Sequence, residues 1–271
     1  MKQLNGKAIY SPKGKAGEYA EYACNFYVGC SNQCEYCYLR KGIGKATLGG
    51  DKPTLKKCFK GEKHALEVFE KELKQNLPEL QKRGLFFSFT TDPMLPETMP
   101  LHGLAVGKCF DNNVPVKVLT KRADWVDYIL EQPFSEREKK MIAFGFTLTG
   151  RDDLEPNAST NAERIEAMYM LHDAGFKTWA SIEPVITFAS SFKMVIDSRH
   201  FCDLFKIGLE SGKKYDKGLL RRFIDDVIEY TEYFGCKLYF KDSLLKRAGI
   251  NREDLPPNCV NVNRDYNMFN N

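Results

Sequence analysis

The sequence predicts an α/β fold in which parallel strands alternate with helices, as an open sheet or as a full or partial barrel. Short β-type runs alternate with amphipathic helical patterns, and no internal repeat, low-complexity tract or linker divides the chain. Its 271 residues, of which 43% are hydrophobic, can bury a large core without help from a disulfide or a metal. We therefore expect one domain spanning residues 1–271, with its chemistry at the carboxyl ends of the strands.

Strand patterns recur along the chain, and polar residues follow several of them. Proline stands near the start of one run, at Pro115, where strands tolerate it. The expected strands are 85–90, 114–120, 141–147, 176–182, 201–208 and 236–240. The residues just past strand ends are Thr91 and Asp92, Thr120 and Lys121, 147–149, Glu183 and Glu210. These positions are where we expect ligands to bind.

Two helices carry clear start and stop signals. Thr160 and Glu163 have the spacing of a capping box, and the apolar stripe that follows them ends at Gly175. Asp216 can cap a second helix, whose apolar face runs as far as Gly235.

The composition excludes several classes of protein. Forty basic and 36 acidic side chains give a net charge of +4, which permits an anionic partner without requiring one. Residues 1–7 lack the apolar core of a signal peptide, and no apolar run reaches the roughly 20 residues of a membrane span. Nine cysteines without an export signal indicate thiols, metal ligands or catalysts. We expect a cytoplasmic protein with no membrane partner.

Three cysteines stand close together in a C-x3-C-x2-C pattern, namely Cys30, Cys34 and Cys37. Thiolates this close can share one soft metal centre in a short loop. A [4Fe–4S] cluster held by three cysteines leaves one iron without a protein ligand, and an open metal position is where chemistry takes place.

Other interpretations of the cysteines stay open. A zinc site needs a fourth ligand, for which His64 is a candidate, although its amphipathic surroundings favour a surface histidine. A zinc- or cluster-stabilised nucleic-acid-binding protein without catalysis is one alternative. A cluster-bearing electron carrier is another, with Cys24 as the nearby fourth ligand.

The cysteine motif with Tyr36 resembles the signature of radical S-adenosylmethionine enzymes. Residues 25–38 are similar to the branch of spore photoproduct lyase-like proteins. Three further matches follow in the same order as in that branch: Thr90-Thr91-Asp92-Pro93, Leu119-Thr120-Lys121, and Leu154-Glu155-Pro156 followed by Arg164 and Ala174-Gly175. The resemblance extends from about residue 25 to residue 210.

This resemblance implies a fold and an activity. The fold is a partial (β/α)6 barrel of the TIM type with parallel strands, its core at about 22–235 and a C-terminal extension at 236–271. Cys30, Cys34 and Cys37 hold a [4Fe–4S] cluster whose open iron binds S-adenosylmethionine. One electron from an external flavodoxin- or ferredoxin-type donor then cleaves the cofactor to a 5′-deoxyadenosyl radical. The substrate is unidentified, with nucleic acid among the candidates.

The resemblance also assigns roles to residues beyond the cysteines. Thr91 and Lys121 are similar in position to contacts of the cofactor's carboxylate, and Tyr36 to a contact of its adenine. Tyr38 is similar to a tyrosine of the radical relay and is our catalytic candidate. The remaining predicted cofactor contacts are Asp92, Thr149, Arg164 and Glu183. Glu183 and Glu210, at two strand ends, are also candidates for substrate contacts, and a salt bridge across the barrel mouth is the alternative for both.

At two places the sequence differs from the spore photoproduct lyase-like branch, and at a third it differs from a phosphate-binding loop. Phe89 stands where the photoproduct lyase has a hydrogen-donating cysteine, so we expect no photoproduct repair. Gly150-Arg151 differs from the branch and leaves the ribose contacts open. Residues 42–45 look like a phosphate loop, but Leu39 occupies the position of its first glycine, so we expect a flexible loop.

Two basic stretches are either solvated faces or phosphate contacts. They are Lys52, Lys56, Lys57, Lys60 and Lys63, and Lys213, Lys214, Lys217, Arg221 and Arg222.

Overall fold

Eight strands form one curved sheet in the computed structural model, which describes residues 2–41, 44–261 and 267–269. In sheet order they are β1 (Ile9–Tyr10), β2 (Ala23–Cys24), β5 (Leu85–Phe87), β6 (Val116–Thr120), β7 (Ile142–Thr147), β8 (Lys177–Val185), β9 (Leu204–Leu209) and β10 (Lys237–Phe240). Every neighbouring pair from β2 to β10 is parallel, and β1 pairs antiparallel with β2. Among the described residues β1 and β10 do not pair with each other, so the sheet is a partial barrel, as predicted.

The strand expected at 236–240 is present as β10. It pairs in parallel with β9 along its whole length and so adds a strand to the sheet within the C-terminal segment. The two-residue β2 and the hairpin of β3 (Tyr27–Val28) with β4 (Thr54–Leu55) are too short to give a sequence pattern.

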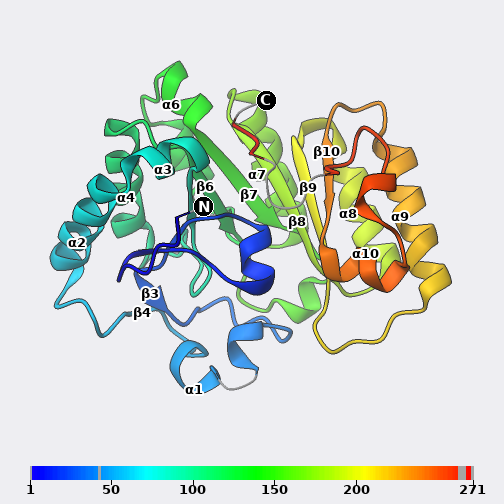
Figure 1. Cartoon of the computed structure of the whole chain (residues 1–271), viewed down its shortest axis with the longest axis horizontal. Helices are drawn as coiled ribbons and strands as arrows, with labels where there is room; N and C mark the ends of the chain where they lie inside the picture. The colour runs from blue at the N-terminus through cyan, green and yellow to red at the C-terminus, as the bar shows by residue number, and fades with distance from the viewer. Residues whose placement is uncertain (1, 42–43, 262–266, 270–271) are drawn as a thin grey trace.

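Helices cover the outer face of the sheet, with α2 and α4 beside one end and α8 and α9 beside the other (Figure 1). The α-helices are α1 (Lys45–Leu48), α2 (Glu62–Gln75), α3 (Leu77–Arg83), α4 (Met99–Asp111), α5 (Val126–Leu130), α6 (Glu136–Met141), α7 (Asn161–Asp173), α8 (Phe188–Ser198), α9 (Lys217–Thr231) and α10 (Asp242–Ala248). Short 3-10 helices are η1 (Gly14–Glu18), η2 (Tyr38–Arg40), η3 (Asp152–Leu154), η4 (Arg199–Phe201) and η5 (Arg252–Asp254). Thr160 caps α7 in a full capping box with Glu163, and Asp216 caps α9, as predicted.

Strand alternation divides the core into two layers. Outward side chains such as Phe144 and Phe146 pack with Trp125 and the helices. Inward side chains such as Phe86 and Trp179 form a second apolar cluster inside the barrel with Tyr19 from the N-terminal segment. Figure 1 shows this segment, in blue, crossing the open side of the sheet.

Two inward lysines anchor the N-terminal segment. The ammonium of Lys206 on β9 donates to the carbonyls of Glu18 (2.7 Å) and Tyr19 (3.2 Å), and that of Lys117 on β6 donates to Tyr19 (3.2 Å). Gly145 leaves room for the ring of Trp179, because a Cβ at this position would lie 2.1 Å from the indole.

Two further expectations concern particular segments. Of the glycine-containing stretch 42–45, Gly42 and Ile43 lie outside the described residues, whereas Gly44 precedes α1. In the part of the chain that the structure describes, no helix combines the length and the apolar character that crossing a membrane requires.

Candidate active site

A cavity of about 690 Å³ opens at the carboxyl ends of the strands, where α/β folds usually bind ligands. It brings together most of the residues that the sequence analysis selects. Cys30, Cys34, Cys37, Tyr36, Tyr38, Thr91, Asp92, Lys121 and Glu183 all line it. Thr149 and Arg164 do not line it and are fully buried.

The cysteine loop begins at a tight backbone contact. Gly29 has φ +85°, and a Cβ there would lie 2.4 Å from the carbonyl oxygen of Lys52. The amide of Cys30 then donates to Gly50 (3.0 Å), and the amide of Cys37 to Cys34 (3.1 Å). These contacts fold the loop so that all three thiols face one cavity.

The thiols have different surroundings. Cys34 is buried, whereas Cys30 and Cys37 are partly exposed. Burial, with the nearby Asp92 carboxylate, raises the pKa of Cys30 to about 12. Burial also raises the pKa of Cys34, against the influence of the Lys121 cation. A metal centre must therefore displace protons to bind these sulfurs.

The cysteines are not arranged around a single point. Within residues 2–41, 44–261 and 267–269, no three His, Cys, Asp or Glu side chains could hold one metal ion. A [4Fe–4S] cluster takes one thiolate per iron, so its ligands lie further apart than those of a single zinc ion. Three thiols that line one cavity are a donor set that suits such a cluster.

Asp92, just past β5, is an acceptor for four donors. Its Oδ2 accepts from Asn32 Nδ2 and from the Lys121 amide, each at 2.8 Å. Its Oδ1 accepts from Thr120 Oγ1 (2.6 Å) and from the Met94 amide (3.0 Å). The carboxylate thus joins the cysteine loop to the end of β6.

Two polar atoms beside the cysteines have no hydrogen-bond partner among the described residues. They are Thr91 Oγ1 and Asn32 Oδ1, both buried, and both residues line the cavity. An unsatisfied buried oxygen is costly unless a ligand or water reaches it. Sequence reasoning had selected Thr91 but not Asn32.

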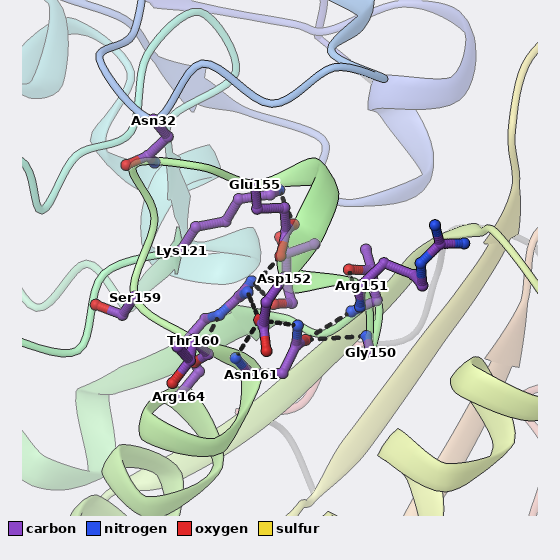
Figure 2. A network of polar contacts seen from close by, with 12 residues as sticks. Asn32, Lys121, Gly150, Arg151, Asp152, Glu155, Ser159, Thr160, Asn161 and Arg164 are labelled. Carbon is purple, nitrogen blue, oxygen red and sulfur yellow. Dashed lines mark hydrogen bonds and ion pairs between the residues drawn. The ribbon is translucent and has the colours of Figure 1, made fainter.

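Glu155, which the sequence analysis did not select as a site residue, is the centre of a buried charge network (Figure 2). One carboxylate oxygen accepts from the guanidinium of Arg164, and both side chains are 0% exposed. The other accepts from Tyr36 Oη and lies 4.0 Å from Lys121 Nζ. Burial opposes ionisation of Glu155, but Lys121, Arg164 and the hydrogen bonds lower its pKa below the usual value.

Arg164 and Thr149 lie behind this network. Arg164 also donates to the Thr147 carbonyl (2.5 Å) and lies 3.6 Å from Asp152. The side-chain oxygen of Asn161 accepts from the amide of Thr149. It also accepts from the amide of Gly150 (Figure 2). Both predicted residues therefore support the cavity wall from outside.

The other end of the cavity has its own polar cluster. Oε2 of Glu183 accepts from Tyr19 Oη (2.5 Å) and Lys241 Nζ (2.7 Å), and Tyr19 Oη also meets Ser181 Oγ (2.6 Å). The salt bridge that was the alternative for Glu183 thus exists, with Lys241. Gly208 lies beneath it, because a Cβ there would be 2.6 Å from Glu183 Cδ.

Aromatic side chains line the region between the two ends. Phe89 stacks on Phe86 with ring centroids 4.3 Å apart, and Tyr38 donates its hydroxyl to the Phe89 carbonyl. Tyr38 keeps 62% of its surface exposed although it lines the cavity. Its ring is therefore available to a ligand.

The remaining candidates lie elsewhere. Cys24, Cys109, Cys202, Cys236 and Cys259 are buried and Cys58 is exposed, and none of them is among the lining residues. His64 accepts a hydrogen bond from the Lys60 amide (3.1 Å). In the basic stretches, Lys56 and Lys213 donate to backbone carbonyls at 2.5 Å.

Comparison with known proteins shows similarity in fold. No protein-family model matches the chain. An uncharacterized protein of Methanocaldococcus jannaschii, MJ0683, is 25% identical, with 77% of this chain and 85% of that protein covered.

Solved structures are similar over most of the chain. Spore photoproduct lyase complexed with dinucleoside spore photoproduct matches with a TM-score of 0.66 at 16% identity, over 85% of this chain and 78% of that one. A mutant of that enzyme with bound AdoMet and the same dinucleoside gives 0.64 at 17% identity, with equal coverage. SuiB of Streptococcus suis bound to S-adenosylmethionine gives 0.54 at 14% identity, over 83% of this chain and 51% of SuiB. The predicted resemblance to the spore photoproduct lyase-like branch is confirmed in the fold.

Proposed function

We propose that this protein is a radical S-adenosylmethionine enzyme acting on a substrate still to be identified. The observation that carries the proposal is that Cys30, Cys34 and Cys37 share one cavity with Thr91 and Lys121, at the sheet edge where the cofactor contacts were predicted. Structures with bound S-adenosylmethionine among those of similar fold support it.

The three thiolates would hold a [4Fe–4S] cluster. When bound and reduced by an external flavodoxin- or ferredoxin-type donor, this cluster supplies the electron that cleaves S-adenosylmethionine to a 5′-deoxyadenosyl radical. The protein's part is to bind, orient and shield the reactants. Asn32 and Asp92 serve this purpose by fixing the cysteine loop against β6.

Lys121 and Thr91 would bind the cofactor's carboxylate. The Lys121 side chain is 17% exposed and supplies a cation at the cavity wall. Thr91 supplies a buried hydroxyl whose hydrogen-bonding capacity is unused within the described chain. A cation and a hydroxyl donor form charge-assisted bonds to a carboxylate.

Tyr36 would contact the adenine through its backbone, because Glu155 accepts the hydrogen bond of its hydroxyl. Asp92, Thr149 and Arg164 would act on the cofactor indirectly. The Asp92 carboxylate is already bonded to four donors, and the other two residues lie outside the cavity lining.

The substrate would occupy the end of the cavity near Glu183 and Lys241. Tyr38 lines the same cavity as the cysteines and Glu183 and is 62% exposed, so it would contact the substrate or pass on a hydrogen atom. Glu183 would contact the substrate here rather than the cofactor.

Photoproduct repair is not the proposed reaction, although a spore photoproduct lyase has the same fold. Phe89 lines the cavity and has no transferable hydrogen. In the described lining the three motif cysteines are the sole thiols. A thiol donor for a substrate radical is thus lacking there.

Cleavage of S-adenosylmethionine by the chemically reduced, reconstituted protein tests the proposal. Formation of 5′-deoxyadenosine, followed chromatographically, is expected for the wild type and for Cys58→Ala, whose cysteine is exposed and outside the cavity. Cys34→Ala should form none. Product formation by Cys34→Ala at the wild-type rate would refute the assignment.

A further inference from the structure

We propose that Glu155 is a positioning residue for the cofactor site. It holds the Lys121 ammonium at the cavity wall, where this ammonium meets the carboxylate of S-adenosylmethionine. The inference rests on the proposed function and adds a residue that neither the motif nor the resemblance assigns to the site.

Glu155 connects three elements that come from distant parts of the chain. Its carboxylate accepts from Tyr36 in the cysteine loop. It also accepts from Arg164 in α7 and faces Lys121 at the end of β6 (Figure 2). A single buried carboxylate therefore fixes the cysteine loop relative to the lysine.

The backbone around Glu155 reinforces this connection. The amide of Glu35 donates to the Leu154 carbonyl (3.0 Å), and the amide of Ser159 donates to the Lys121 carbonyl (3.0 Å). The segment that carries Glu155 thus touches both the loop and the lysine through its main chain. Its side chain has little freedom to move away.

In the network around Glu155, one buried carboxylate faces two cations. Glu155 and Arg164 are both without exposed surface and neutralise each other. Lys121 adds a second cation, which faces the cavity. Its nitrogen is 4.0 Å from Glu155, longer than a direct hydrogen bond, so its N–H groups are available to an incoming carboxylate.

Pre-ordering is what Glu155 contributes to binding. A lysine side chain loses much conformational entropy when it is fixed. Here Glu155 on one side and the Tyr36 ring, 5.4 Å from the ammonium, on the other already restrict it. Ligand binding then costs less than it would with a mobile lysine. Without the carboxylate, the cations of Arg164 and Lys121 would repel each other, and the flexible lysine would withdraw.

The test compares two ligands on the iron-containing protein. S-adenosylmethionine and its decarboxylated analogue differ in the carboxylate. The dissociation constant of the analogue divided by that of S-adenosylmethionine therefore measures recognition of that group. Glu155→Gln should lower this ratio about 10-fold while iron content stays at the wild-type level. In a Lys121→Met background the same substitution should leave the ratio unchanged, because the group it positions is gone.

Asp152→Asn is the matched control. Asp152 is the second carboxylate near Arg164, at 3.6 Å, but its side chain is 49% exposed and has no contact with Lys121. It should keep the wild-type ratio. If Glu155→Gln fails to retain iron, Glu155→Asp takes its place with the same expected fall, because it keeps the negative charge but draws the carboxylate back from Lys121 by one methylene.

Three results would overturn the inference. Equal weakening of both ligands would mean that Glu155 is merely structural. A higher ratio would mean that Glu155 competes with the cofactor for Lys121. Loss of iron in both Glu155 variants, but not in Asp152→Asn, would mean that Glu155 builds the cluster loop itself. A wild-type protein without preference for S-adenosylmethionine would instead contradict the proposed function.

Discussion

Lys121 supplies the charge on which the proposed cofactor site depends. It follows β6 directly, its amide is fixed by Asp92, and its ammonium reaches the cavity beside Cys34. The backbone of this residue thus supports the structure, while its side chain is available for binding. Removing the side chain should therefore affect the ligand without disturbing the loop.

We expect Lys121→Met to weaken binding of S-adenosylmethionine by about 10- to 150-fold. A charge-assisted hydrogen bond contributes about 1.5–3 kcal/mol, which corresponds to this range. Anaerobic calorimetric titration of the iron-containing protein measures it, and iron content should stay unchanged. Affinity equal to that of the wild type would place the carboxylate elsewhere in the cavity.

Asp92 has the opposite role, since its side chain is fully used inside the protein. Asp92→Asn would place an amide N–H₂ against donors that now share the carboxylate, leaving buried donors unsatisfied. We expect the free energy of unfolding to fall by about 2 kcal/mol or more, and the iron content to fall as well. Asp153→Asn is the control, because Asp153 pairs with Arg151 at the surface. Thermal unfolding and iron analysis of the two variants check this, and equal behaviour would argue against the role of Asp92.

At the scale of elements, the inward faces of β6 and β9 explain how the barrel opening is filled. Lys117 and Lys206 alternate with apolar outward residues and donate to the N-terminal segment rather than to solvent. Burial lowers the pKa of Lys117 to about 8. Burial, together with the neighbouring lysines, also lowers the pKa of Lys206 well below its usual value.

The contribution of Lys117 to stability should consequently rise with pH above about 8. Between about 8 and the ordinary lysine value of 10.5, the unfolded chain retains a proton on Lys117 that the folded chain has lost. Raising the pH through this window therefore favours the folded state, by up to about 3 kcal/mol for this group. Buried thiols such as Cys109 and Cys202 act in the opposite direction, because burial raises their pKa. Denaturant titrations of the wild type and Lys117→Met isolate the lysine: the stability difference between the two proteins should shift in favour of the wild type across this window. Parallel pH profiles for the two proteins would contradict it.

Elements with a complete local signal could be predicted from the sequence. The caps at Thr160 and Asp216 place α7 and α9, because a cap depends on residues only three apart. The cysteine loop is equally local. β2 could not be predicted, since two residues carry no periodicity, and the inward direction of Lys117 and Lys206 depends on a segment almost a hundred residues or more away.

The same reasoning explains what was missed in the site. Glu155 belongs to the matched stretch Leu154-Glu155-Pro156, but the match gives it no role, and its burial follows from partners at Tyr36, Lys121 and Arg164. Arg164 was selected through a resemblance as a cofactor contact, whereas its contact with Glu155 could be seen only in the fold. Polar residues after strand ends were the best general guide, because the parallel sheet brings them to one edge.

At the scale of the whole molecule, the partial barrel holds a cavity whose two ends differ in chemistry. Thiols and the Lys121 cation lie at one end, and the Glu183–Lys241 pair at the other, with Phe89 among the residues that line it. The fold is similar to that of spore photoproduct lyase. Under the proposed function, Phe89 and the Glu183–Lys241 pair lead us to expect a different substrate specificity.

We expect the reconstituted enzyme to leave spore photoproduct unrepaired and to form 5′-deoxyadenosine slowly without substrate. The reason is that Phe89 cannot quench a substrate radical and that no thiol outside the motif lines the described cavity. Incubation with the dinucleoside photoproduct and chromatography for released thymine check this. Repair over many turnovers would show that another residue donates the hydrogen.

The most direct test of the central claim is electron paramagnetic resonance of the anaerobically reconstituted, reduced protein, with iron and sulfide measured on the same sample. We predict about four irons and four sulfides per chain. The reduced cluster should give a signal that changes when S-adenosylmethionine is added and that is lost in Cys34→Ala. One zinc without sulfide, or a cluster signal that S-adenosylmethionine leaves unchanged, would contradict the account.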